Sequence, residues 1–395
     1  MVVTAMKNIL LIAYYYLPQN NGGVQRIVNL KKYLSRYGFN VYILTTNAYG
    51  DIHDNDKVFR FSDTGVKIAS SRLRFLSLPF RLIRRILIYF GFITDWYALW
   101  TKDVQENFDR VLNGISFDYI MASYPPIADL EIGEYLSERY DIPLIIDYRD
   151  GFLYEPFKEI TKQSKRYHKK ARELERRISE KSVLNIVVND SMKKYYETMY
   201  STSVVKIENG FDDEEVFDES DTIDLPSGFN IVYTGSLSLS IGAVDMNIIQ
   251  SLIERNDDSN FVFIGSYTKN EMDVFSVYKN VYVYGKQSRD KIIPIQRRAD
   301  LLLLCSGELE GGTSGKLFEY IFSGTPILNI GGKNDASVII DNTHTGETFL
   351  GKDATKIREY ILAVRSGEYS ISPKDLEKYT RREQIKKLAS VLDSL

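Results

Sequence analysis

Residues 8–46, NILLIAYYYLPQNNGGVQRIVNLKKYLSRYGFNVYILTT, contain the pattern from which the fold class can be predicted. Residues 8–16 form a continuous apolar run, which is typical of a strand covered on both faces of a parallel sheet. A turn with two glycines follows, and then apolar side chains recur at helical spacing until Gly38 ends the helix. Residues 40–46 predict a second strand. A strand, loop, helix and strand in this order predict a Rossmann-type βαβ unit.

Short apolar strands and helices continue to alternate as far as about residue 208, and the pattern restarts at residues 229–237, FNIVYTGSL. Between them, residues 212–228 are acidic and lack periodicity, so we expect a connector there. A chain of 395 residues is long for a single core, and two domains of about 200 residues are the natural expectation. The sequence therefore predicts an α/β protein with two Rossmann-like domains facing a cleft, the first spanning 1–208 and the second beginning at 209.

The composition excludes several classes of protein. A net charge of -3 gives no bias toward nucleic acid. The single cysteine, Cys305, excludes an internal disulfide framework and fits a reducing cytoplasm, and its apolar surroundings favour a packing role. The three histidines lie far apart without metal-ligand spacing, which argues against a zinc site. The first residues lack the basic region and cleavage site of a signal peptide, so we expect a buried strand there.

Residues 72–100, RLRFLSLPFRLIRRILIYFGFITDWYALW, interrupt the alternation. Arginines alternate with aromatic and aliphatic residues, and the longest uncharged apolar run is far shorter than the ~20 residues that span a bilayer. This composition suits a helix on an anionic membrane surface. The alternative is a pair of helices that cap the first domain, with arginines exposed and tryptophan in the core. The basic stretch at 162–181 alternates in sign and is expected to be mainly a solvated helix face.

Two loops of the first half could form a ligand site, because ligands bind beyond the carboxyl ends of parallel strands. Gly22 and Gly23 would let the backbone approach a ligand, and the helix after them offers free N–H groups to an anion; an ordinary turn is the alternative. Asp147, Arg149 and Asp150 cluster at the end of an apolar strand. They form either a site or a structural Arg–Asp ion pair.

Two loops of the second half predict a nucleotide site. A Gly-Ser turn follows the first strand, and a glycine-rich turn opens the helix of GGTSGKLFEYIFSG (311–324) with small residues and free amides that suit a diphosphate. Lys316 at a helix N-terminus is unfavourable without an anionic partner. Glu319, on the same face, can accept two hydrogen bonds from a ribose; the alternative is an i,i+3 ion pair worth ~0.2–0.5 kcal/mol. The candidate residues are Gly235, Ser236, Thr313, Ser314, Gly315, Lys316 and Glu319.

Five stretches together resemble the GT-B glycosyltransferases, particularly glycosyltransferase family 4. Each is weakly specific, but they occur in the family's order over most of the chain. They are 14–46, with the opening strand and glycine loop; IIDYRD (145–150); 187–216, leading through Asn-Gly to the second domain; GGTSGKLFEYIFSGTPIL (311–328); and YTRREQIKKLASVLDSL (379–395).

The resemblance implies sugar transfer from a nucleotide-diphosphate sugar, with a UDP- or GDP-sugar as the expected donor. The C-terminal domain (209–377) would bind the donor, and the N-terminal domain (1–208) with the returning C-terminal helix (about 378–395) would bind the acceptor. Glu319 would bind the ribose, Gly235 and Ser236 would line the donor pocket, and Gly22 and Gly23 would lie near the diphosphate and acceptor. Helix N-termini and basic side chains would neutralise the diphosphate, so neither a metal nor another cofactor is expected.

The sequence departs from the family pattern at three places. Gly311 takes the counted position of the first motif glutamate, with Glu308 and Glu310 out of register. The loop after TGSL lacks the Arg and Lys that clamp the diphosphate in many members, and Lys316 is our candidate replacement. The N-domain histidine is also missing, with Tyr124 and Pro125 in its region. Retaining and inverting chemistry therefore both stay open, and Asp150 is our candidate for a general base.

The leading hypothesis is a metal-independent, hexosyltransferase-type enzyme that builds a bacterial surface glycan, such as a capsule or lipopolysaccharide, at the cytoplasmic face of the membrane. A nucleotide-sugar 2-epimerase of the same fold is one alternative, and a non-catalytic nucleotide-sugar-binding protein is another. A dehydrogenase is disfavoured because GGVQR does not form G-x-G-x-x-G. The Asp-x-Asp at 54–56 lies in a polar loop rather than at a strand end, which argues against a metal-dependent transferase. The sequence does not identify the sugar, base, acceptor or oligomeric state.

Overall fold

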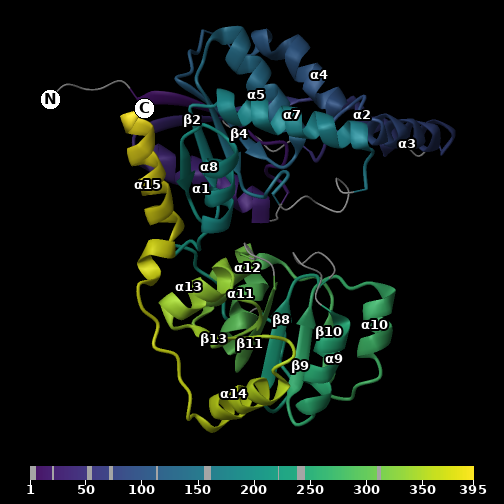
Figure 1. Ribbon diagram of the computed structural model, residues 1–395, viewed down its shortest axis with the longest axis vertical. Coiled ribbons are helices and arrows are strands. Elements are labelled where there is room, and N and C mark those ends of the chain that lie inside the picture. Colours follow the sequence, from purple (N-terminus) through teal and green to yellow (C-terminus); the bar gives the residue numbers. More distant parts are fainter. Residues whose placement is uncertain are drawn as a thin grey trace. The chain divides into compact units, whose positions relative to one another are not determined.

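The computed structural model describes residues 6–19, 22–50, 56–70, 74–112, 114–154, 162–220, 222–237, 245–308 and 313–395, with only the backbone described at 74–76. The chain divides into two compact units (Figure 1). Unit 1 consists of Met1–Glu208 and Ile385–Leu395, and unit 2 of Asn209–Gln384. The sequence analysis had placed the return of the chain to the first domain at about residue 378.

Unit 1 is built on a parallel sheet of 7 strands in the order β3-β2-β1-β4-β5-β6-β7. This is the Rossmann order, in which two βαβ halves diverge from β1 and β4. The strands are β1 (Lys7–Ile12), β2 (Phe39–Thr46), β3 (Val58–Phe61), β4 (Tyr119–Tyr124), β5 (Leu144–Tyr148), β6 (Leu184–Val187) and β7 (Val204–Lys206). The helices are α1 (Gly22–Arg36), α2 (Thr64–Ala69), α3 (Arg74–Tyr89), α4 (Ala98–Asn107), α5 (Ile127–Tyr140), α7 (Lys165–Lys181) and α8 (Asp190–Met199), with a 3-10 turn at Phe108–Arg110. Unit 1 also contains α15 (Arg381–Ser394) from Ile385 onward.

The sheet of unit 1 is covered on both faces, as its continuous apolar strands predict. Leu10 and Ile12 of β1 point into a core that includes α4, α5 and α7. Ile9 and Leu11 point to the other face, where they pack with α1 and with Leu388 of α15. The Lys7 ammonium donates to the Leu392 carbonyl at 2.9 Å. The predicted packing of the C-terminal helix against the first domain is therefore confirmed.

The segment at 72–100 forms α3 and leads into α4, and residues 72–73 lie outside the described part of the chain. Trp100 is fully buried, as expected for capping helices, whereas Trp96 is exposed. The expectation that the arginines are exposed holds for Arg81 and Arg85 but is wrong for Arg84. The Arg84 guanidinium, on α3, packs against Gly65 of α2. The absence of a side chain at Gly65 leaves room for it, because a Cβ there would lie 2.1 Å from Nη1.

Unit 2 repeats the architecture with a parallel sheet of 6 strands in the order β10-β9-β8-β11-β12-β13. The strands are β8 (Asn230–Thr234), β9 (Asn260–Ile264), β10 (Val281–Tyr284), β11 (Leu301–Gly307), β12 (Ile327–Gly331) and β13 (Gly346–Phe349). The helices are α9 (Met246–Arg255), α10 (Lys269–Phe275), α11 (Arg289–Arg298), α12 (Gly315–Ser323), α13 (Asp335–Thr343) and α14 (Ala354–Ser366), with a 3-10 turn at Leu376–Tyr379. The predicted α/β class with two Rossmann-like domains is confirmed.

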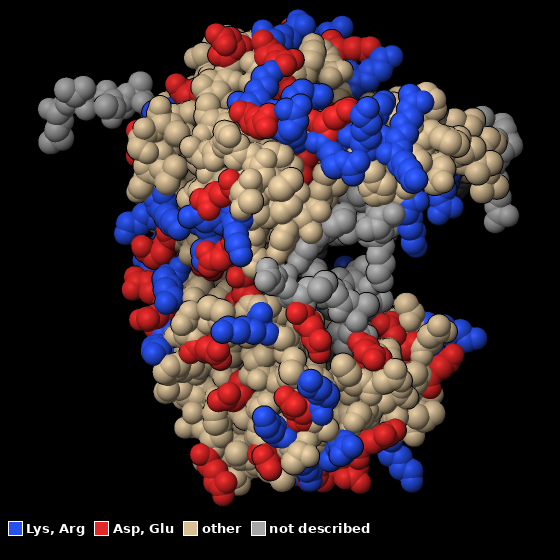
Figure 2. Space-filling view, in the orientation of Figure 1, with Lys and Arg blue, Asp and Glu red and all other residues tan. Residues whose placement is uncertain are grey.

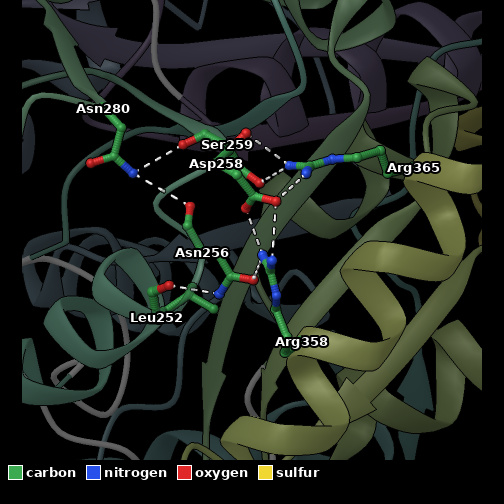
Figure 3. A network of polar contacts seen from close by, with 7 residues as sticks. All are labelled: Leu252, Asn256, Asp258, Ser259, Asn280, Arg358 and Arg365. Carbon is green, nitrogen blue, oxygen red and sulfur yellow. Dashed lines mark hydrogen bonds and ion pairs between the residues drawn. The ribbon is translucent and has the colours of Figure 1, made fainter.

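Charged side chains brace unit 2 at the amino ends of its strands. Asp258, just before β9, accepts hydrogen bonds from Arg358 at 2.6 and 3.0 Å and is also paired with Arg365 (Figure 3). The Arg358 guanidinium reaches the Asn256 side chain as well, at 3.0 Å. The two arginines lie one below the other on α14, so this network ties α14 to the turn between α9 and β9. Because ligands bind at the opposite ends of parallel strands, we take this network to be structural.

Among the helices that the structure describes, none is both long enough and apolar enough to cross a membrane.

Candidate functional site

Helix α12 carries the predicted nucleotide residues of unit 2 and is anchored by one face. Leu317, Phe318, Tyr320 and Ile321 are buried, which leaves Lys316 and Glu319 on the half-buried face. The Tyr320 hydroxyl accepts a hydrogen bond from the Thr234 backbone at 3.0 Å and donates to the Leu303 carbonyl at 3.3 Å. These bonds fix α12 to β8 and β11, so its first turn lies beside the carboxyl end of β8.

Lys316 lies across the turn that follows β8. Its ammonium donates to the Tyr233 hydroxyl at 2.8 Å and lies 4.6 Å from the centre of that ring. A Cβ at Gly235 would lie 2.5 Å from the lysine Cε and 2.8 Å from Nζ. The Tyr233 hydroxyl in turn donates to the Ser236 carbonyl at 3.1 Å. The structure therefore brings together Gly235, Ser236 and Lys316, and adds Tyr233, which the sequence analysis missed.

Burial changes the acid–base behaviour of Lys316. It lowers the pKa of the ammonium to about 8, while the neighbouring Cys305 and Glu319 side chains act in the opposite direction. An anion bound next to the ammonium would raise this pKa, because a nearby negative charge favours the protonated form. An anionic ligand would therefore stabilise the protonated form of Lys316. The buried Cys305 lies close enough to this ammonium to influence its pKa.

Glu319 has a different partner from the one that its spacing suggests. It forms an ion pair with Nη1 of Arg289, and Arg289 is held on its other side by Glu215, at 2.6 Å from Nη2. Lys316 thus binds the Tyr233 hydroxyl and Glu319 binds Arg289. The alternative, an i,i+3 ion pair between Lys316 and Glu319 on a solvated helix, is not what the structure shows. Neither Arg289 nor Glu215 was predicted. The signal that could have found Arg289 is its position at a helix N-terminus, where a cation needs carboxylates.

The remaining predicted residues of this loop lie at the entry to α12. Thr313 is buried, Ser314 is the N-cap residue, and Gly315 is exposed as the first residue of the helix. The Ser314 side chain makes no capping hydrogen bond to α12, and the first N–H groups of a helix need acceptors from outside it. Glu310, Gly311 and the loop at 238–244 lie outside the described residues.

In unit 1, the glycine loop and the strand-end arginine meet. Arg149 follows β5, and its guanidinium lies against Gly23, at the start of α1: a Cβ there would be 1.5 Å from Nη1. Nη2 donates to the Pro125 carbonyl at 2.6 Å, after β4. A Cβ at Gly22 would meet nothing within 4 Å. Of the two glycines, Gly23 is therefore the one that the arginine requires.

Asp150 is half-buried next to this arginine. Burial raises the pKa of its carboxyl group, Arg149 and Arg26 lower it, and Asp147 raises it. A carboxylate with a raised pKa accepts a proton more readily, which suits a general base. The role of Asp150 as a catalytic base stays a prediction.

Asp147 is part of a structural ion pair, but its partner is not Arg149. Arg26 of α1 binds both carboxylate oxygens of Asp147, with a shortest contact of 2.7 Å, and the Ser123 hydroxyl donates to the same carboxylate at 2.9 Å. Arg26 and Asp147 are almost fully buried. This pair ties the start of α1 to the end of β5 and so fixes the two loops that carry Gly23 and Arg149. Arg26 was missed, although a charged residue among buried helix positions should indicate a buried partner.

Within the described ranges, no group of three His, Cys, Asp or Glu side chains is clustered as metal ligands would be.

Sequence comparison finds a family match over the first part of the chain. Residues 20–215 match the family described as Glycosyltransferase Family 4. No curated protein matches the chain by sequence.

Solved structures match the whole chain. Anabaena Alr3699/HepE in complex with UDP has a TM-score of 0.60 at 14% identity, covering 99% of this chain and 100% of that one. The lipopolysaccharide outer core galactosyltransferase WaaB has a TM-score of 0.59 at 12% identity, with 98% and 99% covered. The UDP-GlcNAc 2-epimerase of Methanocaldococcus jannaschii has a TM-score of 0.56 at 10% identity, with 99% and 100% covered. At these identities the likeness establishes the fold.

Proposed function

The chain is a glycosyltransferase family 4-like protein with the GT-B fold, and from this premise we propose that it transfers a sugar from a nucleotide-diphosphate sugar to a glycan or lipid-linked acceptor. The acceptor belongs to a bacterial surface polysaccharide, a capsule or lipopolysaccharide, and the sugar is a hexose. The donor is a UDP- or GDP-sugar, which the UDP complex of HepE supports for UDP. Transfer takes place at the cytoplasmic face of the membrane.

The observation that carries this proposal is the position of Lys316 over Gly235 at the entry to α12. In the transfer, the bond between the anomeric carbon and the diphosphate oxygen breaks, and the acceptor hydroxyl oxygen bonds to that carbon. The leaving diphosphate gains negative charge, which Lys316 and the N–H groups of α12 would stabilise without a metal or other cofactor. The hydroxyl proton would pass to Asp150 in an inverting reaction, or to the leaving phosphate in a retaining one.

The first experiment is a thermal-shift screen with UDP, GDP, ADP, CMP and dTDP, repeated with Glu319→Ala. A ligand that binds only the native state at 100 times its dissociation constant stabilises it by about 2.7 kcal/mol. We expect one nucleoside diphosphate to stabilise the wild type and to lose its effect in the variant. If none of the five shifts the melting temperature, a GT-B protein without a working donor site is the better description.

A nucleotide-sugar 2-epimerase is the second candidate function, because UDP-GlcNAc 2-epimerases share the fold over nearly the whole chain. The two activities differ in their products. An epimerase interconverts two nucleotide-sugars without an acceptor, whereas a transferase releases free nucleoside diphosphate when an acceptor is present. NMR of the purified protein with UDP-GlcNAc distinguishes them, since a new C2 epimer without free UDP would favour the epimerase.

We also propose that residues 72–100 contact the membrane surface peripherally, and helix α3 supports this part of the proposal. Its exposed apolar side chains continue into the following turn and are Leu78, Leu82, Ile83, Ile86, Tyr89, Phe90 and Phe92. Leu78 and Leu82 are each 61% exposed, and Phe92 is 58% exposed. We call these seven residues the α3 face. So much exposed apolar surface on one helix marks an interaction site in a water-exposed protein.

A basic flank lies next to the α3 face. The Ser164 N–H bonds the Tyr89 carbonyl at 3.2 Å, and the Arg166 guanidinium lies 4.6 Å from the centre of the Phe92 ring. The exposed basic residues in this part of α7 are Lys165, Arg166, Lys169, Lys170 and Arg172. Figure 2 shows the blue side chains gathered over α7, beside the tan surface of α3. Basic residues flanking exposed apolar side chains suit an anionic bilayer surface.

A further inference from the structure

Arg289 joins two carboxylates that come from distant parts of unit 2. Its Nη2 lies 2.6 Å from Oε2 of Glu215, and its Nε lies 3.4 Å from Oε1 of the same group. Its Nη1 is paired with Oε1 of Glu319. The side chains are 15% exposed at Arg289, 23% at Glu215 and 25% at Glu319, so solvent reaches this group only in part.

The geometry of a guanidinium makes this arrangement rigid. Its five N–H donors lie in one plane and at fixed angles, so a carboxylate bound to Nε and Nη2 sets the direction of Nη1. Arg289 is also the first residue of α11, where a positive charge is unfavourable unless carboxylates balance it. Glu215 thus holds Arg289, and Arg289 holds one oxygen of Glu319. Within the described part of the chain, the second oxygen, Oε2, has no hydrogen bond or ion pair and is the one left to meet a ligand.

We propose that Arg289, held by Glu215, is the positioning residue that presents the Glu319 carboxylate to the ribose hydroxyls of the donor. This assignment rests on the proposed function and extends it to a residue outside the glycine-rich helix. Arg289 itself need not touch the nucleotide. Its effect is to keep Glu319 in the one orientation in which its free oxygen faces the sugar.

A purely structural ion pair and a positioning role differ in one measurable quantity. If Glu319 binds the ribose hydroxyls, the protein prefers a ribonucleotide to its 2′-deoxy analogue, which has lost one of them. A structural role for Arg289 would change stability, or the affinity for both nucleotides alike, but not the ratio between them. The test is therefore the ratio of dissociation constants for UDP and 2′-deoxy-UDP, and for GDP and 2′-deoxy-GDP, measured by calorimetry.

We expect the wild type to prefer the ribonucleotide by about 10-fold, since the lost hydrogen bond is to a charged group. Glu319→Gln and Arg289→Gln should both bring the ratio close to one. Arg289→Lys keeps the charge without the fork and should lower it in part, and Glu215→Gln, which leaves Arg289 in place, should do the same. Arg297→Gln is the matched control on the same helix, where Arg297 pairs with Glu219 and packs on Phe322, and it should keep the wild-type ratio.

Three results would overturn the assignment. An Arg289→Gln protein that binds the nucleotide with the wild-type ratio would reduce Arg289 to a structural ion pair. A wild type that binds both analogues equally would remove the ribose contact of Glu319. If the wild type binds neither the uridine pair nor the guanosine pair, the proposed function fails together with this assignment. Failure of the proposed function is thus distinguishable from failure of the Arg289 assignment alone.

Discussion

Lys316 can lie over the turn after β8 only because residue 235 is glycine. The lysine Cε would be 2.5 Å from a Cβ at this position, and Gly235 has a φ of +110°, which side chains rarely adopt. One glycine therefore satisfies two requirements, a backbone conformation and the path of a buried cation. Lys316 in turn belongs to the group that we propose to bind the donor diphosphate.

Gly235→Ala should displace Lys316 and strain the turn. We expect a loss of about 1–3 kcal/mol in stability and at least a tenfold weaker nucleotide affinity, because the cation no longer reaches its place. Gly285→Ala is the matched control, since a Cβ at Gly285 meets nothing within 4 Å. Thermal melts and calorimetry measure both effects. Unchanged nucleotide affinity in Gly235→Ala would show that the position of Lys316 is unimportant for binding.

Nucleotide affinity should depend on pH through Lys316, whose pKa is lowered to about 8 by burial. A bound diphosphate raises this pKa, so binding takes up a proton wherever the free lysine is neutral. The nucleotide affinity should therefore be constant below pH about 8. Above it, the affinity should fall with rising pH, with a slope that approaches a tenfold loss per pH unit. Titrations between pH about 7.5 and about 9.5 avoid the ionisation of the terminal phosphate. Lys316→Met should bind weakly and without this dependence; a wild-type affinity that stays flat over the range would exclude the role.

Gly23→Ala should expel the Arg149 guanidinium, because the new Cβ would overlap Nη1 at 1.5 Å. We expect sugar transfer to fall at least tenfold while the protein stays folded, as the arginine belongs to the proposed acceptor and diphosphate loop. Gly22→Ala is the control in the same loop, and it should be tolerated sterically. A transfer assay with circular dichroism as the folding check compares the two. Equal activity of both variants would remove Arg149 from the site.

The α3 face and its basic flank should bind anionic vesicles. Wild type is expected to sediment with phosphatidylcholine vesicles that contain phosphatidylglycerol, and not with pure phosphatidylcholine. Lys169→Glu/Lys170→Glu should weaken binding at least tenfold, since each basic residue near the surface contributes about 1 kcal/mol, and Leu82→Asp/Ile86→Asp should abolish it.

The control for these vesicle experiments is Lys279→Glu/Lys352→Glu, with two exposed lysines of unit 2 changed in the same way. It should bind as the wild type does. If this control weakens binding as much as the α7 variant, net charge rather than the α3 face accounts for the attraction.

Asp258→Asn should lower stability without affecting nucleotide binding. The Arg358 and Arg365 guanidinium groups hold the pKa of the Asp258 carboxyl below its usual range. A lowered folded-state pKa stabilises above the unfolded pKa of about 3.9 and loses that effect as the pH falls through the folded-state value. Asp258 is 41% exposed, so after screening we expect about 1 kcal/mol, or a melting point lower by about 2–4 °C. A variant that melts with the wild type at pH 7 would show that the network contributes nothing.

The repeating βαβ pattern could be predicted because each strand and helix leaves a signal in its own stretch of sequence. Strands buried on both faces appear as continuous apolar runs, such as residues 9–12 and 301–304, and need no tertiary information. The sequence analysis identified neither β3 nor β13, and it identified none of the short helices α2, α10 and α13. β3 and β13 are only four residues long and largely half-buried, so neither shows a clear pattern of buried and exposed residues. α10 and α13 have only seven and nine residues, too few for helical periodicity to stand out from the surrounding sequence.

The amino-acid sequence was enough to predict the α/β class, the restart of the pattern in a second domain, and the candidate loops at the ends of the strands. Which charged side chains meet depends on the fold. Asp147 pairs with Arg26 from 121 residues away, and Glu319 pairs with Arg289, because partners at strand ends are set by sheet order and not by distance along the chain. The fold also determines that α3 keeps its apolar side chains exposed while Trp100 is buried. Local hydrophobicity measures how much a side chain gains from burial, whereas the packing of the other elements decides which side chains find room.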